Sequence, residues 1–144
     1  LLPEGLRDRL PPEAEAAATI LRATLDRIAA HGYERVAPPL VEFETELVGR
    51  LQPGGEHDHF RFVDPVSGRT LALRPDMTAQ VGRIASTRLA GAPRPLRLCY
   101  GGPVIKFRAR QLRPERELIQ AGAELIGTDG IAAAVETVAV AIDA

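Results

Sequence analysis

Four side chains that could bind one small molecule fall in two short segments. Gln120 and Glu124 would point to one face of an expected strand, and Gly122 between them would leave room for a ligand. Asp76 and Thr78 stand at an expected helix start and could close the site from the side. A carboxylate and a hydroxyl suit an ammonium group, Gln120 would help fix it, and Glu124 could accept a hydrogen bond from an imidazole N–H. The combination predicts a site for a small zwitterion.

Cations precede this set in the sequence. Lys106, Arg108 and Arg110 alternate along an expected strand, so they would share one of its faces. If the two strands form a hairpin, cations, an amide and a carboxylate converge over one sheet surface. Each piece also fits a simpler interpretation: alternating charges are typical of a solvated face, Asp76 of a helix cap, and Glu124 of burial beside an arginine. Only the joint pattern favours a binding site.

Other candidate sites are weaker. His57 and His59 lie in a polar loop without a second ligand cluster at metal spacing, so a solvated loop is favoured and no metal is expected. Cys99 lies among apolar strand residues, which is typical of core packing. The paired glycines 54–55 and 101–102 match neither the dinucleotide nor the P-loop pattern, and no cofactor is expected.

Composition is that of an ordinary globular domain. The 144 residues are 45% hydrophobic and 26% charged, enough for one domain with a core. A net charge of −1 gives no general attraction to nucleic acid, which makes it an unlikely partner. The sequence contains no run of about 18 apolar residues, so no membrane span is predicted. A single cysteine excludes an internal disulfide, and we expect a cytoplasmic protein.

Hydrophobic periodicity and breakers predict an α+β domain over residues 1–144, with an antiparallel sheet and helices packed to one side of it. Thr128 and Asp129 are expected to cap the last helix. The expected helices are 13–30, 43–51, 76–89 and 131–142. The expected strands are 33–37, 60–63, 69–73, 96–100, 104–110 and 117–125, with a hairpin at 64–68.

Residues 73–80 and 102–127 resemble the class II histidyl-tRNA synthetase catalytic domain, and more closely its non-catalytic paralogue, the ATP phosphoribosyltransferase regulatory subunit. The opening residues 2–8 are similar to the leader of that subunit. Residues 32–42 resemble class II motif 1, and this likeness implies that Pro39 and Glu42 lie at a dimer interface. The resemblance therefore implies a class II synthetase-like core.

The resemblance also separates amino-acid contacts from nucleotide contacts. Synthetases hold the ATP α-phosphate with an arginine where this chain has Lys106, and they carry a glutamate where it has Arg108. Lysine lacks the bidentate fork of arginine, and Arg108 reverses the charge. Leu118 replaces the aromatic side chain that stacks on adenine, while Arg116 is retained. Lys106, Arg108 and Arg116 thus resemble the remnant of a nucleotide or anion site.

By contrast, the family's histidine contacts fall on chemically suitable residues: Asp76, Thr78, Gln120 and Glu124. A glutamate and a glycine of synthetases are replaced by Asp76 and Met77. Motif 3 has no counterpart in residues 1–144, so we expect the motif 1 and motif 2 part of a longer, truncated core.

These features imply a non-catalytic regulatory subunit in histidine biosynthesis. It would bind histidine as an allosteric feedback signal and assemble, as a homodimer within a hetero-oligomer, with the catalytic ATP phosphoribosyltransferase subunit. The alternative is a histidyl-tRNA synthetase domain that activates histidine with ATP. A third possibility is a dimerisation domain whose pocket is vestigial.

Overall fold

The computed structural model describes residues 1–48, 59–108 and 114–144. Its helices are α1 (Glu13–Ala30), α2 (Glu44–Val48), α3 (Thr78–Ser86) and α4 (Ile131–Asp143). Its strands are β1 (Glu34–Arg35), β2 (Val41–Phe43), β3 (Arg61–Val63), β4 (Thr70–Leu73), β5 (Leu96–Ile105) and β6 (Glu117–Ile126). Within the described ranges the strands form two sheets, in the orders β1-β5-β6 and β2-β4-β3.

The long antiparallel pair β5–β6 forms the centre of the fold. Its register runs from Leu96 opposite Ile126 to Ile105 opposite Glu117. Strand β1 adds to the other edge of β5 in parallel, with Glu34 opposite Leu98. A parallel neighbour needs a long crossover, and here the smaller sheet and α3 lie between the two strands in the chain. The α+β class is confirmed, and β1 adds one parallel neighbour to the predicted antiparallel sheet.

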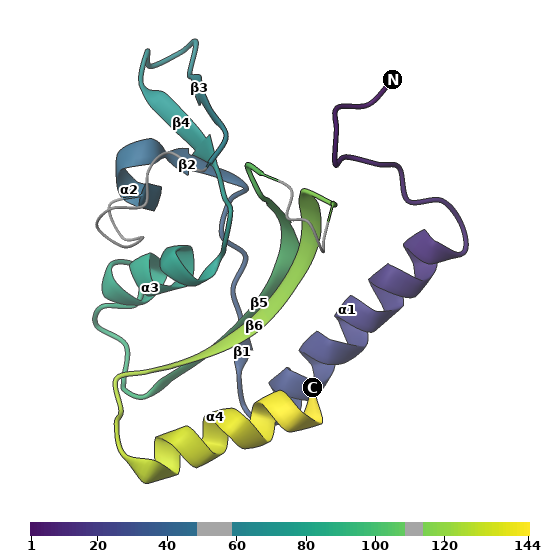
Figure 1. The fold of residues 1–144 in the computed structure, drawn as a ribbon. Helices are drawn as coiled ribbons and strands as arrows, with labels where there is room; N and C mark the ends of the chain where they lie inside the picture. The colour runs from purple at the N-terminus through teal and green to yellow at the C-terminus, as the bar shows by residue number, and fades with distance from the viewer. Residues whose placement is uncertain (49–58, 109–113) are drawn as a thin grey trace.

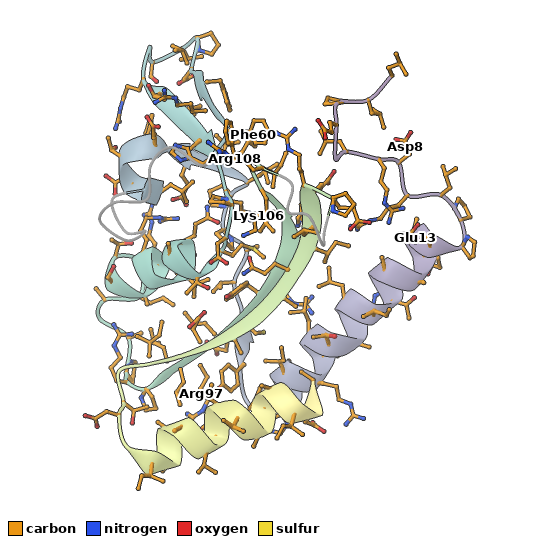
Figure 2. All side chains as sticks on the ribbon, in the orientation of Figure 1. Asp8, Glu13, Phe60, Arg97, Lys106 and Arg108 are labelled. Atoms are coloured by element: carbon orange, nitrogen blue, oxygen red, sulfur yellow. The ribbon has the colours of Figure 1, made fainter. Side chains whose placement is uncertain are left out.

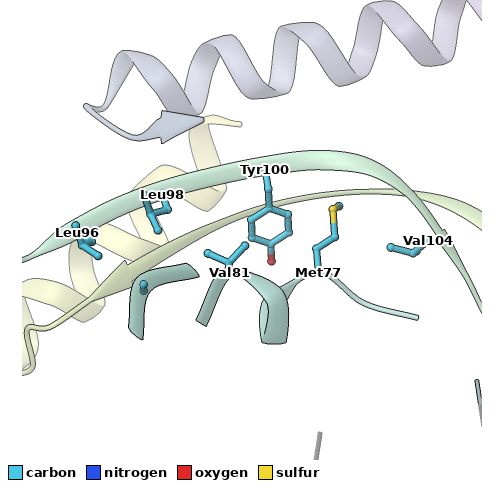
Figure 3. Packing of buried hydrophobic residues seen from close by; sticks show 7 residues of the cluster. Met77, Val81, Leu96, Leu98, Tyr100 and Val104 are labelled. Atoms are coloured by element: carbon cyan, nitrogen blue, oxygen red, sulfur yellow. The ribbon is translucent and has the colours of Figure 1, made fainter. Parts of the chain in front are cut away.

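Helices cover both faces of this pair, with α3 on one side and α1 and α4 on the other (Figure 1). Against α3 lies a buried cluster, seen from close by in Figure 3, made by Met77, Val81, Ala85, Leu96, Leu98, Tyr100 and Val104. On the opposite face Ile28, Tyr33, Cys99 and Val140 form a second cluster. The prediction that helices pack to one side is therefore wrong. Both faces of β5 are apolar, since Leu98 and Cys99 point to opposite sides and are only 1% and 0% exposed.

Strand β5 is continuous where the sequence predicts a break at Gly101-Gly102-Pro103. A Cβ on Gly101 would lie 2.7 Å from Leu21 of α1, and one on Gly102 would lie 2.9 Å from the guanidinium of Arg74. These glycines therefore admit close neighbours on the two faces of the strand. At the other end β5 stops at Ile105, so Lys106 and Arg108 lie beyond it and not on one strand face as predicted. Arg110 lies outside the described residues.

The expected hairpin is present as β3 and β4, with Arg61 opposite Ala72. Its turn is held by Asp64, whose carboxylate accepts bonds from the Ser67 hydroxyl and from the backbone N–H groups of Val66 and Ser67. The Ser67 hydroxyl, followed by these amides, lowers the pKa of Asp64. Gly68 takes a left-handed φ of 69°, which glycine adopts without a steric cost.

The bounds of α1 and α4 follow the sequence closely, while α2 begins one residue later than predicted and its predicted end lies outside the described residues. Helix α1 has the predicted bounds Glu13–Ala30, whereas α3 is shorter than predicted and ends at Ser86. Helix α4 begins after Gly130, which has a φ of 92° and no side-chain capping bond, so the expected cap by Thr128 and Asp129 is wrong. No helix among the described residues has the length and apolar character needed to cross a bilayer.

Candidate functional site

The structure brings the four predicted ligand residues to one region, between the start of α3 and the α3-facing side of β6. The side-chain amide of Gln120 donates to Asp76 Oδ2 over 2.6 Å. Its carbonyl Oε1 accepts from the backbone N–H of Met77 over 3.0 Å. The other oxygen of Asp76 accepts from the N–H of Thr78 over 2.7 Å, in the manner of a helix cap. Strand β6 and the α3 N-terminus are thus joined through one carboxylate and one amide.

A fifth residue, Tyr100, links the remaining two. Its hydroxyl donates to Glu124 Oε1 over 3.0 Å and lies 2.9 Å from the hydroxyl oxygen of Thr78. The ring lies between β5 and α3, with its hydroxyl directed toward α3 near Met77 and Val81 (Figure 3). Burial raises the pKa of Tyr100 to about 12, so the phenol is protonated at neutral pH. The sequence does not predict Tyr100 as part of the site. Tyr100 lies in an expected apolar strand, so its position indicates a core residue.

Gly122 has a different role from the one predicted. It lies opposite Tyr100 in the β5–β6 register. A Cβ at this position would lie 2.5 Å from the Tyr100 hydroxyl oxygen. The space that glycine leaves is therefore taken by the Tyr100 ring and not by a ligand, and the prediction is corrected in that respect.

The site is accessible to solvent. Asp76, Gln120 and Glu124 are half-buried, and Thr78 is exposed. Two carboxylates in this setting favour a cationic group, which would offset their charges. A half-buried carboxylate also binds a donor more strongly than an exposed one, because water competes less. The arrangement can accept hydrogen bonds from an ammonium group and from a ring N–H. Whether it binds histidine stays a prediction.

The predicted anion residues gather where β5 ends, near Phe60 and far from Arg97 (Figure 2). Lys106 donates from Nζ to the Pro75 carbonyl over 2.6 Å. Arg116 donates from Nε to the Lys106 carbonyl over 3.3 Å and stacks over the Phe60 ring at 4.6 Å. Arg108 is exposed.

The leader is attached to the same region. Arg116 donates from Nη1 to the Glu4 carbonyl over 3.1 Å, and its backbone N–H bonds the Gly5 carbonyl over 2.7 Å. Backbone carbonyls thus occupy one side-chain donor of Lys106 and two of Arg116. Lys106 therefore helps to hold the segment before α3, and Arg116 helps to hold the leader, residues 2–8.

The predicted interface residues Pro39 and Glu42 line an open groove. The Pro39 carbonyl accepts from the Gln80 amide over 2.8 Å, and Glu42 pairs with Arg83 of α3. The groove has a volume of about 670 Å³. Apolar side chains of Val41, Phe43 and Leu71 also line it. Glu46 and Arg88 add further charges to its lining. An open groove with both apolar and charged walls fits a subunit contact, which stays a prediction.

His59 is not in a solvated setting, contrary to expectation. Its side chain is 5% exposed, and its Nε2 lies 2.8 Å from Glu44 Oε1 of α2. The Glu44 pKa is lowered mainly by this bond. His57 lies outside the described residues. In the described part of the chain no three His, Cys, Asp or Glu side chains are grouped as a metal site.

Comparison with known proteins shows the family to which the chain belongs. The sequence model of the histidyl-tRNA synthetase family matches residues 5–144. The chain belongs to the histidyl-tRNA synthetase family. The class II synthetase-like core is confirmed by a Bacillus halodurans structure titled ATP phosphoribosyltransferase regulatory subunit/histidyl-tRNA synthetase. That structure is 34% identical with a TM-score of 0.83, over 99% of this chain and 36% of that one.

Relatives within the family divide between two names. The apo histidyl-tRNA synthetase of S. aureus is 26% identical with a TM-score of 0.77, over 99% of this chain and 33% of that one. A Paramagnetospirillum magneticum protein named ATP phosphoribosyltransferase regulatory subunit is 49% identical over all of this chain. A Rhodospirillum rubrum protein of the same name is 47% identical over all of it. The resemblance to the regulatory subunits is thereby confirmed. The chain spans 38% of the length of each of these two relatives.

Proposed function

We propose that this chain is the synthetase-like part of an ATP phosphoribosyltransferase regulatory subunit, and that it binds free histidine as a feedback signal. One observation carries the proposal: Asp76, Thr78, Gln120 and Glu124 meet in one accessible hydrogen-bonded site. Acceptors placed in this way suit the ammonium group and the imidazole N–H of histidine. The names of the relatives at 49% and 47% identity support the regulatory assignment.

The nucleotide side of the site supports a non-catalytic role. Lys106 bonds a backbone carbonyl and lacks the fork that grips a phosphate. Arg108 places a positive charge where synthetases carry a glutamate, and Leu118 offers no aromatic face for adenine. Activation of histidine requires the ATP phosphates to be held beside the amino-acid carboxylate. At these three positions the chain lacks the side chains that synthetases use to hold ATP.

Feedback requires histidine to distinguish two states of an assembly with the catalytic subunit, because equal affinity for both shifts nothing. A coupling of about 1–3 kcal/mol would correspond to a roughly 5- to 150-fold difference in histidine affinity between the two states. The open groove beside Pro39 and Glu42 would supply the homodimer contact within that hetero-oligomer. In this proposal the protein works in the cytoplasm, where histidine is made.

Calorimetry on the full-length protein tests the proposal. Histidine should bind the wild type, and Glu124→Ala should weaken binding at least about tenfold, since it removes a charged acceptor. Glu117→Ala is the matched control, because Glu117 is exposed on the same strand and lies on its opposite face. Equal histidine affinity in all three proteins would refute the assignment of this site.

The alternative function is a histidyl-tRNA synthetase, which the family model and the S. aureus structure keep open. Pyrophosphate exchange with histidine and ATP separates the two functions. The regulatory proposal expects no exchange above background with the full-length protein. Robust exchange would overturn it in favour of the synthetase.

A further inference from the structure

The proposed site contains two hydrogen-bond chains, and both run toward a carboxylate. In the first, the Met77 N–H donates to Gln120, and Gln120 donates to Asp76. In the second, the hydroxyls of Thr78 and Tyr100 are 2.9 Å apart, and Tyr100 bonds Glu124 over 3.0 Å. The direction of each chain follows from chemistry, because a carboxylate at neutral pH only accepts hydrogen bonds.

Tyr100 fixes the direction of the second chain. A phenol has one proton, and the bond to Glu124 uses it, so the Tyr100 oxygen must accept at its other contact. The proton in that contact therefore comes from Thr78. The Thr78 oxygen is left with lone pairs alone for a ligand, and the second oxygen of Glu124 can likewise only accept. Because burial raises the pKa of Tyr100 to about 12, this direction holds throughout the neutral range.

Gln120 fixes the first chain in the same way. Turning its amide over would set its NH₂ against the Met77 N–H and its oxygen against the Asp76 carboxylate, and both contacts would be repulsive. Asp76 therefore also presents only acceptor capacity. Three groups from two elements, Asp76 and Thr78 near the α3 start and Glu124 on β6, offer the ligand oxygen lone pairs and no proton.

We propose that Tyr100 is a specificity-determining residue: by taking the Thr78 proton and bonding Glu124 it leaves these two groups to the ligand as acceptors only, so that together with Asp76 they select a ligand carrying both an ammonium group and a ring N–H. This inference rests on the proposed histidine site and states which groups of the ligand that site recognises. A ligand with an acceptor in place of either donor would face a lone pair and lose binding. Tyr100 acts through Thr78 and Glu124, and is in that sense a positioning residue.

The test compares histidine with its two ring N-methyl isomers on the full-length protein by calorimetry. In the wild type, the isomer that lacks the N–H facing Glu124 should bind at least about tenfold more weakly than histidine. In Tyr100→Phe, histidine affinity should fall about tenfold and the ratio between histidine and that isomer should shrink, because Thr78 and Glu124 can then turn toward each other.

Tyr33→Phe is a matched control. Tyr33 is also buried, and its hydroxyl also bonds a glutamate, Glu136, over 3.1 Å, but it packs in the cluster on the opposite face of the sheet. It should change stability as Tyr100→Phe does and leave both ligand affinities unchanged. If Tyr100→Phe does not fold, Glu124→Gln replaces it, since the amide oxygen keeps the Tyr100 bond and the NH₂ adds a donor that should abolish the preference.

The outcomes separate the two proposals. Histidine binding with the same isomer ratio in wild type and Tyr100→Phe, or in Glu124→Gln where that variant is used, overturns this inference and leaves the histidine site standing. A wild type that binds neither histidine nor its isomers overturns both. A loss of selectivity in Tyr33→Phe equal to that in Tyr100→Phe shows a general packing effect and also overturns the inference.

Discussion

Arg97 of β5 donates two hydrogen bonds to the carboxylate of Glu136 on α4, from Nε over 2.6 Å and from Nη2 over 2.8 Å. The Tyr33 hydroxyl donates to the same carboxylate over 3.1 Å. Three donors from β5 and from the segment before β1 thus converge on one side chain of α4. This carboxylate orients the last helix on the sheet face opposite to α3.

A first prediction concerns pH and the attachment of α4. The bonds from Arg97 lower the pKa of Glu136 below its ordinary value of 4.5. A carboxyl with a depressed folded pKa contributes stability that is present above its unfolded pKa and is lost as pH falls through the folded value. Thermal melts should therefore show wild type and Glu136→Gln converging as pH falls below about 4.

Its control is Glu117→Gln, which removes an exposed carboxylate on β6 and reports the effect of losing one surface charge. Because the Arg97 and Glu136 side chains are 35% and 31% exposed, added salt should also reduce the difference between wild type and Glu136→Gln at pH 7. A difference between them that persists unchanged at pH 3 would contradict the role assigned to this carboxylate.

A second prediction concerns the core between β5 and α3. Leu98 is 1% exposed and packs in the cluster with Val81 and Met77. Leu98→Ala should lower the free energy of unfolding by about 2–5 kcal/mol, through lost burial and the cavity that remains. Chemical denaturation measures this loss. Val66→Ala at the hairpin turn, where Val66 is 92% exposed, should change stability by less than about 0.5 kcal/mol.

Features that follow from local sequence patterns could be predicted, whereas features that depend on pairing between distant segments could not. Gln120 and Glu124 share a face because strand alternation is a local rule, and Asp76 and Thr78 follow from a helix start. Tyr100 could not be predicted in its role, since that role depends on the register that sets it opposite Gly122. The same non-local pairing places β1 parallel to β5, which no local pattern encodes.

The failures at the ends of elements have a similar cause. The sequence 101–103 contains two glycines and a proline, which predict a break, yet β5 continues because β6 pairs with it along its whole length. The glycines are explained by Leu21 and Arg74, which come from distant segments. Lys106 falls outside β5 although its charge alternates with Arg108, so alternation alone did not fix the strand end.

A third prediction concerns the groove beside Pro39. Val41 lines it next to Glu42, in a region that the likeness to motif 1 implies is a dimer contact. Val41→Glu should shift the full-length protein from dimer toward monomer, because it replaces an apolar contact by a charge that must lose its water at the interface. Light scattering across a concentration series measures the shift. Val66→Glu, at the exposed hairpin turn, is the control and should leave the mass unchanged; equal behaviour of the two variants would contradict the interface.

A fourth prediction separates two glycines that differ in their surroundings. A Cβ on Gly122 would lie 2.5 Å from the Tyr100 hydroxyl, which is already held by Thr78 and Glu124. The ring cannot move without losing those bonds, so Gly122→Ala should destabilise the protein by about 1–3 kcal/mol. Histidine affinity should fall with it, because Glu124 is displaced.

Gly82 offers the opposite case within α3. A Cβ there meets no described heavy atom within 4 Å, and alanine favours a helix over glycine. Gly82→Ala should therefore stabilise the protein by about 0.5–1 kcal/mol and leave histidine affinity unchanged. Chemical denaturation measures the stability of both glycine variants, and calorimetry measures their histidine affinity. If Gly122→Ala were as stable as wild type, the Tyr100 ring would have room to spare, and the packing of Tyr100 over Gly122 would not hold the site together.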